Sequence, residues 1–260
     1  MRCGDILEKL EELSPSSYAL SWDNVGLLVG RKDKEIHKVC IAVDATSEVI
    51  DEAVRMKADL LLTHHPMIFH GQKRVCLDDY IGKRIIKLIQ NDMCMIALHT
   101  NFDVMGMADA AADELNLKGR EVLEVTSSQE GIHEGIGRYG RLPQIMTLRE
   151  CAEYVKKVFH LPQVMVYGDL LQDVEKMAVL PGAGKDEVEN ALFVGADVYL
   201  TGDVSHHAGI DAVEKGINVI DAGHFGIEQI FMPYMKDYFG REMREVEVEL
   251  AKQELPYHIV

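Results

Sequence analysis

Three short stretches of the sequence contain residue types that bind metal ions, and two of them share a His-x-x-x-carboxylate spacing. They are T-H-H-P at residues 63–66, H-T-N-F-D at residues 99–103 and G-H-F-G-I-E at residues 223–228. Each follows an apolar run that predicts a buried strand, and strands of an open α/β sheet deliver the side chains at their carboxyl ends to one edge. A single histidine after a strand is more often a hydrogen-bonded structural residue, but three such stretches favour a shared metal site.

The adjacent residues His64 and His65 suggest that this site holds two ions. Consecutive side chains of a strand point to opposite faces, so both histidines reach one ion only if the backbone turns sharply there. With two divalent ions, Asp103 and His224 would add one ligand each and Glu228 would bridge. Each ion would then have three protein ligands and keep positions for water or substrate, as catalytic sites do. A set of nitrogen and oxygen donors fits Zn, Mn, Fe, Co or Ni.

His99 is compatible with three roles at such a site. It could be a sixth ligand, a proton carrier beside metal-bound water, or a group that orients Asp103. We expect it in or next to the site and name it the candidate catalytic residue. The sequence has no G-x-S-x-G, H-E-x-x-H or dinucleotide-binding fingerprint, and we expect no organic cofactor.

The elements that would position these residues alternate along the chain. Short apolar runs predict buried strands, and helix-period stretches lie between them. This alternation indicates an α/β fold with helices packed on substantially parallel sheets. The predicted strands are residues 39–43, 59–62, 94–98, 176–180, 197–200 and 218–220. The predicted helices are residues 47–57, 81–91, 108–117, 148–159, 186–195, 206–216 and 228–239.

An internal repeat adds to this organisation. Residues 49–65 align without gaps on residues 187–203, at an offset of 138 in the numbering. The spacing from His99 to Asp103 is echoed from His224 to Glu228, at an offset of 125. The alternative to a duplication is that a helix, an Ala-Asp pair and a strand in succession are a common sequence pattern in α/β proteins.

The repeat predicts two similar α/β domains related by internal duplication. The first would span residues 1–125 and carry the His-His and His-x-x-x-Asp motifs, and the second would span residues 126–260 and carry the His-x-x-x-Glu motif. The glycine-rich residues 131–143 mark the junction or a β-rich connection. The boundary is approximate, and the C-terminal segment could pack back on the first domain.

Composition excludes several classes of protein. The chain has 260 residues and ordinary globular usage, which excludes a mainly disordered or collagenous chain. Its formal net charge of −16 disfavours binding to nucleic acid and to anionic membranes. Five widely spaced cysteines without a C-x-x-C pair argue against a disulfide framework and a structural zinc site. Without a signal sequence or a long apolar run, the sequence predicts a cytoplasmic protein.

Five ordered motifs resemble one known family. They are S-W-D-N-V-G-L-L-V-G, T-H-H-P, H-T-N-F-D, T-G-D-V-S-H-H and D-A-G-H-F-G-I-E, at residues 21–30, 63–66, 99–103, 201–207 and 221–228. Together they are similar to the GTP cyclohydrolase 1 type 2 homolog family, also called the NGG-one-interacting-factor-three-like family. The resemblance covers nearly the whole chain, which looks like the short form without the inserted domain of larger members.

The resemblance implies a toroidal homohexamer of subunits with two similar α/β domains each. It also implies a dinuclear metal site facing the central cavity, with the ligands His64, His65, Asp103, His224 and Glu228. The family name implies a ring opening of GTP by hydrolysis.

Three other motifs each have a functional and a structural interpretation. Residues 22–24 are interpreted as a turn in which Asp or Asn bonds its own backbone, and residues 181–186 (P-G-A-G-K-D) as a tight turn in preference to a phosphate-binding loop. His206 and His207 would either line the cavity or start a helix.

Two functions fit the predicted site. The first is a metal-dependent hydrolase acting on a small anionic or nucleotide-like molecule. The second is a metal-storage or metal-delivery protein without turnover, which would use the same ligands.

Overall fold

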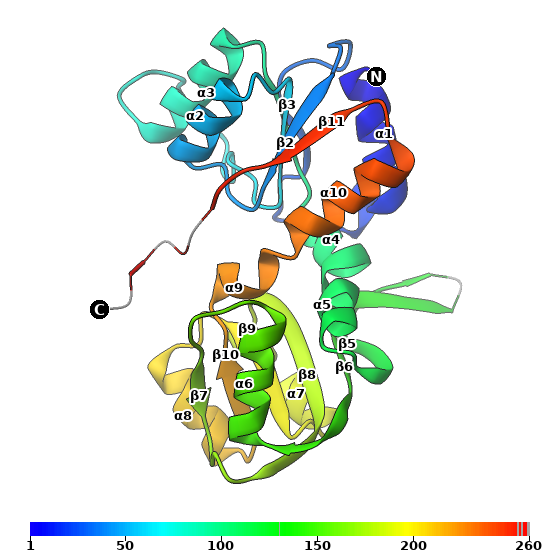
Figure 1. The fold of residues 1–260 in the computed structure, drawn as a ribbon, viewed down its shortest axis with the longest axis vertical. Coiled ribbons are helices and arrows are strands. Elements are labelled where there is room, and N and C mark those ends of the chain that lie inside the picture. The colour runs from blue at the N-terminus through cyan, green and yellow to red at the C-terminus, as the bar shows by residue number, and fades with distance from the viewer. Residues whose placement is uncertain (130, 254, 256, 259–260) are drawn as a thin grey trace. The chain divides into compact units, whose positions relative to one another are not determined.

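The computed structural model describes residues 1–129, 131–253, 255 and 257–258 and divides the chain into two units. Unit 1 comprises Met1–Phe102 and Phe231–Val260, and unit 2 comprises Asp103–Ile230 (Figure 1). The division therefore lies at Phe102 and not near residue 125, because the strand β5 (Lys118–Gln129) pairs within the sheet of unit 2. The C-terminal strand β11 (Glu247–Leu250) returns to unit 1, where it pairs with β2 (Lys38–Ala42).

Unit 1 is built on a five-stranded sheet in the order β1-β4-β3-β2-β11. The strands β11, β2, β3 and β4 are parallel, and β1 is antiparallel at the edge. The three strands not yet bounded are β1 (Gly26–Val29), β3 (Leu60–Thr63) and β4 (Cys94–Ala97). Every residue of β3 and β4 is buried, as expected for a parallel sheet covered on both faces.

Helices cover both faces of this sheet, α2 and α3 on one and α1 and α10 on the other (Figure 1). The core on the first face includes Val49 and Ile50 of α2, Leu88 of α3, Cys40 and Leu61. The helices of unit 1 are α1 (Cys3–Leu13), α2 (Ser47–Arg55), α3 (Tyr80–Gln90), the short α4 (Thr100–Phe102) and α10 (Phe231–Glu242), with a 3-10 turn at Ser16–Tyr18.

Unit 2 is built on a six-stranded sheet in the order β5-β6-β8-β9-β10-β7. The strands β8, β9 and β10 are parallel, and the others join antiparallel on either side. The strands not yet bounded are β6 (Ile132–Thr147), β7 (Met165–Tyr167), β8 (Asp173–Ala183), β9 (Val198–Gly202) and β10 (Asn218–Asp221). The glycine-rich residues 131–143 thus belong largely to β6, a β-rich connection.

The helices of unit 2 also pack on its sheet. The core of one face joins Val188 and Ala191 of α7 and Ala212 of α8 to Tyr199 and Val219 of the sheet. The helical elements are a π-helical turn (Asp103–Met107), α5 (Ala108–Glu114), α6 (Leu148–Val158), a 3-10 turn (Lys185–Glu187), α7 (Val188–Phe193), α8 (His206–Glu214) and α9 (His224–Glu228). These observations confirm the predicted α/β class.

The central strand pairs of the two units share one register. Val39 pairs with Leu60 in unit 1, and Met177 pairs with Val198 in unit 2. Each residue of the second pair follows its counterpart in the first pair by 138 positions, the offset of the repeat. This identity of register supports the predicted duplication.

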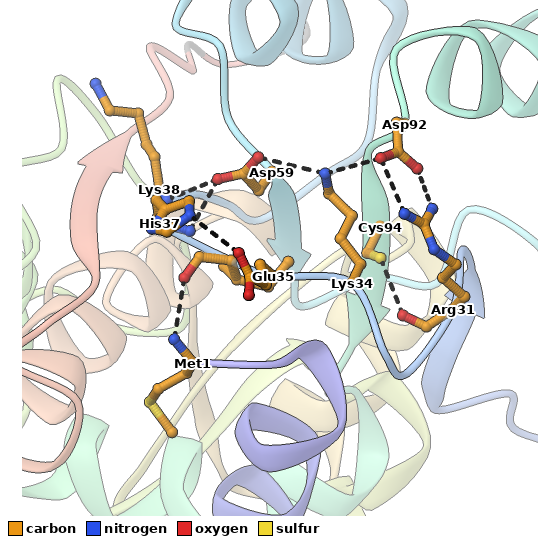
Figure 2. Close-up of polar contacts among 10 residues, drawn as sticks. Met1, Arg31, Lys34, Glu35, His37, Lys38, Asp59, Asp92 and Cys94 are labelled. Atoms are coloured by element: carbon orange, nitrogen blue, oxygen red, sulfur yellow. Dashed lines mark hydrogen bonds and ion pairs between the residues drawn. The ribbon is translucent and has the colours of Figure 1, made fainter.

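An aspartate closes each of these strand pairs in the same way. Oδ2 of Asp59 accepts hydrogen bonds from the backbone N–H groups of His37 (2.9 Å) and Lys38 (3.1 Å), as Figure 2 shows. Oδ2 of Asp197 accepts from Glu175 (2.9 Å) and Lys176 (2.8 Å), again at the repeat offset. The Ala-Asp pair of the repeat is therefore a structural device that ties the start of one strand to the start of the next.

Two sequence expectations need refinement. The helix predicted at residues 228–239 is two helices, because α9 ends at Glu228 and α10 begins at Phe231, where the chain passes from unit 2 back to unit 1. The cysteines are free thiols, and burial raises the pKa of Cys40 and of Cys151 to about 12, so both are small core residues. Among the described residues, we find no helix with the length and apolar character that a bilayer-crossing segment requires.

Candidate metal centre

Three histidines meet at the carboxyl ends of two neighbouring strands of unit 1. His64 and His65 follow β3, and His99 follows β4 after Leu98. Each offers one ring nitrogen, and these nitrogens lie within 4.8 Å of one another. The ring of His99 has its centroid 5.3 Å from that of His64 and 5.4 Å from that of His65. The predicted gathering of imidazoles at one sheet edge is therefore present.

The expectation that His64 and His65 point to opposite faces is wrong. Their ring centroids are 4.8 Å apart. Strand β3 ends at Thr63, whose hydroxyl donates a hydrogen bond to the backbone oxygen of His65 (2.8 Å) and bends the chain. Side-chain alternation holds only along extended backbone, so it does not apply beyond this turn. A two-ion arrangement therefore cannot be argued from alternation.

Oxygen acceptors fix the orientation of both rings. Nδ1 of His64 donates to the carbonyl oxygen of Leu98 (2.8 Å), and Nδ1 of His65 donates to Oδ1 of Asp44 (2.7 Å). An oxygen at Nδ1 holds the proton there and leaves the lone pair on Nε2. Histidines that ligate metals commonly make this kind of bond with the nitrogen that does not face the ion.

His99 is held by a buried carboxylate. Its Nδ1 donates to Oδ1 of Asp23 (2.8 Å), and Oδ2 of Asp23 accepts from the backbone N–H (2.9 Å) and the hydroxyl (2.5 Å) of Thr100. Burial raises the pKa of Asp23, but the bonds from His99 and Thr100 outweigh it and bring the pKa to about 2. Asp23 is therefore ionised at neutral pH and stabilises a proton on Nδ1 of His99, which leaves Nε2 as the basic nitrogen.

Unit 2 supplies a second group of candidate metal ligands on a single helix. His224 begins α9 and Glu228 ends it, so they share one helix face, and Nε2 of His224 lies 3.2 Å from Oε1 of Glu228. Nδ1 of His224 donates to Oδ2 of Asp203 (2.8 Å). His224 thus repeats the arrangement of the three histidines of unit 1.

Two glycines make room for this helix. Gly182, at a φ of +80°, lies where an added Cβ would come 2.5 Å from Oε1 of Glu228. An added Cβ on Gly202 would come 2.5 Å from the backbone nitrogen of His224. The contact at Gly202 is with backbone, which cannot move aside, so α9 approaches the end of β9 only because this position lacks a side chain. At Gly182 the end of the Glu228 side chain would have to shift, and the positive φ favours glycine there.

The fifth predicted ligand, Asp103, stands at the point where the chain enters unit 2. It directly follows Phe102, the last residue of that segment of unit 1, and begins the π-helical turn Asp103–Met107. Within single units, the structure thus brings together His64, His65 and His99, and separately His224 and Glu228.

Sequence reasoning missed the residues that support these side chains. Asp44, Asp23 and Asp203 orient histidines, and Gly182 leaves space for Glu228. The repeat carried a signal for Asp203, since its offset matches Asp203 with His65.

The offset of 125 between His99 and His224 does not hold in the sheets. The backbone N–H of Leu98 donates to the carbonyl oxygen of Thr63, and the N–H of Ala222 makes the equivalent bond to Thr201. Leu98 and Ala222 are 124 positions apart. His99, which follows Leu98, therefore corresponds to Gly223, which follows Ala222.

The other motifs have mainly structural roles. His206 and His207 start α8 after the cap Ser205 and are exposed. Strand β8 ends at Ala183 and the 3-10 turn Lys185–Glu187 follows, with the backbone N–H of Glu187 donating to the carbonyl oxygen of Gly184 (3.0 Å), as expected for a tight turn between strand and helix. Asp23 accepts from the backbone N–H of Asn24 (2.7 Å), as predicted, but it also bonds His99.

Comparison with known proteins identifies the family. The model of the Duf34/NIF3 (NGG1p interacting factor 3) family matches residues 1–256. The chain belongs to the Duf34/NIF3 family. A relative from Clostridium perfringens, named GTP cyclohydrolase 1 type 2 homolog, is 36% identical over 88% of this chain and 87% of its own length. This confirms the resemblance found in the sequence.

Solved structures of Duf34/NIF3 relatives share the fold over the full chain. A Bacillus cereus protein related to NIF3 matches with a TM-score of 0.91 and 26% identity, covering 100% of this chain and 99% of the other. Reduced HcgD from Methanocaldococcus jannaschii matches with a TM-score of 0.84 and 32% identity, covering 97% and 98%.

Proposed function

We propose that this Duf34/NIF3 protein binds two divalent metal ions through His64, His65, Asp103, His224 and Glu228, and that it is a metal-dependent hydrolase of a small anionic or nucleotide-like substrate. The observation that carries the proposal is the common arrangement of its histidines. His64, His65 and His224 each donate from Nδ1 to an oxygen and direct Nε2 elsewhere. A hydrogen bond that fixes the ring through the other nitrogen is typical of histidines that ligate metals.

The covalent chain supports a joint role for residues of the two units. The rings of Phe102 and Phe231 are in contact within unit 1, with centroids 5.3 Å apart, and Phe231 lies 5.4 Å from His64. Asp103 is bonded to Phe102, and Glu228 precedes Phe231 by three positions in the sequence. Both acidic residues therefore lie close in the sequence to the two connections between the units.

The donor set suits the proposed ions. Three imidazole nitrogens and two carboxylates fit divalent ions such as Zn, Mn, Fe, Co or Ni, and the carboxylates offset part of the positive charge. Bound ions of this kind act as Lewis acids and lower the pKa of a coordinated water. In this account His99 accepts or returns a proton at Nε2, while ionised Asp23 stabilises the charged imidazole.

The experiment that tests the proposal is a substrate panel on metal-reconstituted protein. The panel includes GTP and phosphodiesters, and Glu228→Ala serves as the inactive variant. Glu153→Ala is the matched control, because Glu153 is an exposed glutamate of α6 whose carboxylate pairs with Lys156 on the same helix. We expect turnover that is lost in Glu228→Ala and kept in Glu153→Ala. No turnover on any substrate, together with tight and reversible metal exchange, would favour metal storage or delivery.

We also propose a ring of six copies, as the family resemblance implies. Each copy carries a formal charge of −16, so apolar interfaces must outweigh repulsion between like-charged subunits. Light scattering at moderate salt is expected to give six times the mass of one chain. The mass of a single chain would contradict the ring.

A further inference from the structure

Two exposed aromatic rings stand next to the histidines of unit 1. Trp22 is the only tryptophan of the sequence and is 54% exposed, and Phe69 is 42% exposed. Their ring centroids are 5.6 Å apart with an interplanar angle of 46°. Tryptophan is usually well buried, so its exposure beside a second aromatic ring indicates a surface that meets a ligand.

Hydrogen bonds hold this pair in place. The residues that follow Trp22 are both anchored: Asp23 bonds His99 and Thr100, and Asn24 donates from Nδ2 to the carbonyl oxygen of Ile68 (2.5 Å). The second bond joins the turn of Trp22 to the loop of Phe69, since Ile68 precedes Phe69 directly. Hydrogen bonds therefore fix the backbone that carries the two rings, so little conformational entropy is lost when a ligand binds.

His99 connects the aromatic pair to the metal-binding histidines. Its ring centroid lies 5.9 Å from Trp22 and 6.4 Å from Phe69, with edge contacts to both. On its other side it lies 5.3 Å from His64 and 5.4 Å from His65. A molecule resting on the aromatic pair would therefore be one imidazole away from the nitrogens that face the proposed ions.

We propose that Trp22 and Phe69 form a stacking platform for a planar nitrogen heterocycle, which is part of the substrate. The rings of the pair are too close and too inclined for another ring to enter between them, so the heterocycle would stack on the outer face of Trp22. Heterocycles of the purine type suit such a surface, because every base has a π-face and the stacking tolerates different bases. The inference rests on the proposed function in that it names the substrate class of the same site.

The single tryptophan makes the platform directly observable. Adenosine, guanosine and, as the probe without a heterocycle, ribose are titrated against the full chain while Trp22 emission is recorded, with and without added metal. We expect saturable quenching by a purine nucleoside and none by ribose. Phe69→Leu should weaken the response about fivefold or more. Phe193→Leu is the control, because Phe193 is 91% exposed and belongs to unit 2, and it should leave the response unchanged.

A second variant tests the platform without the fluorescence signal. Equilibrium dialysis with labelled nucleoside should show binding to Trp22→Leu about tenfold weaker than to the wild type. Unchanged binding, equal responses to ribose and nucleosides, or emission that changes only with protein concentration would overturn the platform, the last in favour of contact with a second copy. Metal content is measured in parallel. Trp22→Leu that keeps its metal and loses nucleoside binding supports the inference, whereas a wild type that holds no metal but binds nucleosides contradicts the proposed hydrolase alone.

Discussion

In unit 1 the imidazoles of the candidate metal site stand at the end of a strand, whereas in unit 2 the candidate imidazole begins a helix. The repeat offset takes His64 and His65 to Gly202 and Asp203. In unit 1 this position provides two rings, and in unit 2 it provides a glycine that admits α9 and a carboxylate that orients His224. The same strand end thus supplies either a candidate ligand or its support.

The shared scaffold explains why this exchange of roles is possible. The register of the central strands and the closing aspartates Asp59 and Asp197 are alike in both units. These features stabilise the sheet and do not depend on the residues beyond the strand ends. Chemistry can therefore change at the strand ends while the sheet stays the same.

The largest expected effect comes from Gly182, which has no counterpart of its kind in unit 1, where the same offset leads to Asp44. Gly182→Ala would place a Cβ 2.5 Å from Oε1 of Glu228 on backbone that alanine rarely adopts. We expect a loss of about 2 kcal/mol in unfolding free energy from the backbone strain, and a loss of metal binding because the Glu228 carboxylate must move. Gly216→Ala is the control, because its φ is +94° but an added Cβ would contact nothing within 4 Å. Equal metal binding by both variants would contradict the role of Gly182.

The closing aspartates should be equivalent. Asp59→Ala and Asp197→Ala each remove a carboxylate that accepts two backbone N–H groups, and we expect each to cost about 2 kcal/mol in chemical denaturation. A difference of several fold between the two would break the structural equivalence of the units.

The pKa of Asp59 adds a dependence on pH. Burial raises this pKa, but hydrogen bonds from His37 and Lys38 and the ion pair with Lys34 lower it below the ordinary value. A lowered pKa means that the stabilisation is present above the unfolded pKa of about 4 and is lost as the pH falls through the folded value. Asp59→Asn should therefore flatten the acid limb of the stability curve. An unchanged limb would show that Asp59 keeps an ordinary pKa.

The carboxylates that orient histidines provide a sharper comparison of function. Asp44 holds His65 in unit 1, and Asp203 holds His224 in unit 2. Asp44→Asn and Asp203→Asn should each weaken metal affinity by about 10- to 100-fold, because the ring loses its fixed orientation. Metal titration by calorimetry measures both. Wild-type affinity in either variant would show that the corresponding histidine does not depend on its carboxylate.

The smallest expected effect concerns the residue that ends the helix between the paired strands. Lys57 in unit 1 and Gly195 in unit 2 are related by the repeat offset and both have positive φ, +56° and +71°. Lys57→Gly should stabilise the protein by about 1 kcal/mol, and Gly195→Ala should destabilise it by about as much. Thermal unfolding that moved in the opposite direction for either variant would contradict this equivalence.

Much of the scaffold could be predicted from the sequence, because buried parallel strands are continuous apolar runs and their helices have clear periods. The strand pairs β2 with β3 and β8 with β9 fall where such runs occur. The edge strands β1, β7 and β11 are not predicted, because each has only three or four residues and β11 alternates between charged and apolar side chains. The domain boundary at Phe102 could not be found either, because it depends on which sheet β5 joins.

The sequence predicts which residues form the candidate site, but not how their side chains are oriented. Histidines after strands were sufficient to select His64, His65, His99 and His224. The turn after Thr63 could not be predicted, because it involves a hydrogen bond from the Thr63 hydroxyl to the backbone oxygen of His65 (2.8 Å). The orientation of both histidine rings depends on this turn. Supports such as Asp44 and Asp203 lie far from their histidines in the sequence, so only the folded chain reveals them.

The most direct test of the account is metal analysis of His65→Ala, Glu228→Ala and the double variant after reconstitution, with circular dichroism to confirm folding. One variant changes unit 1 and the other changes unit 2, so the experiment asks whether the units serve one centre. We expect up to two ions per chain in the wild type, weaker retention of the remaining ion in each single variant, and nearly none in the double variant. Full occupancy in the double variant, or single variants that each lose one ion and bind the other with unchanged affinity, would contradict a centre shared by the two units.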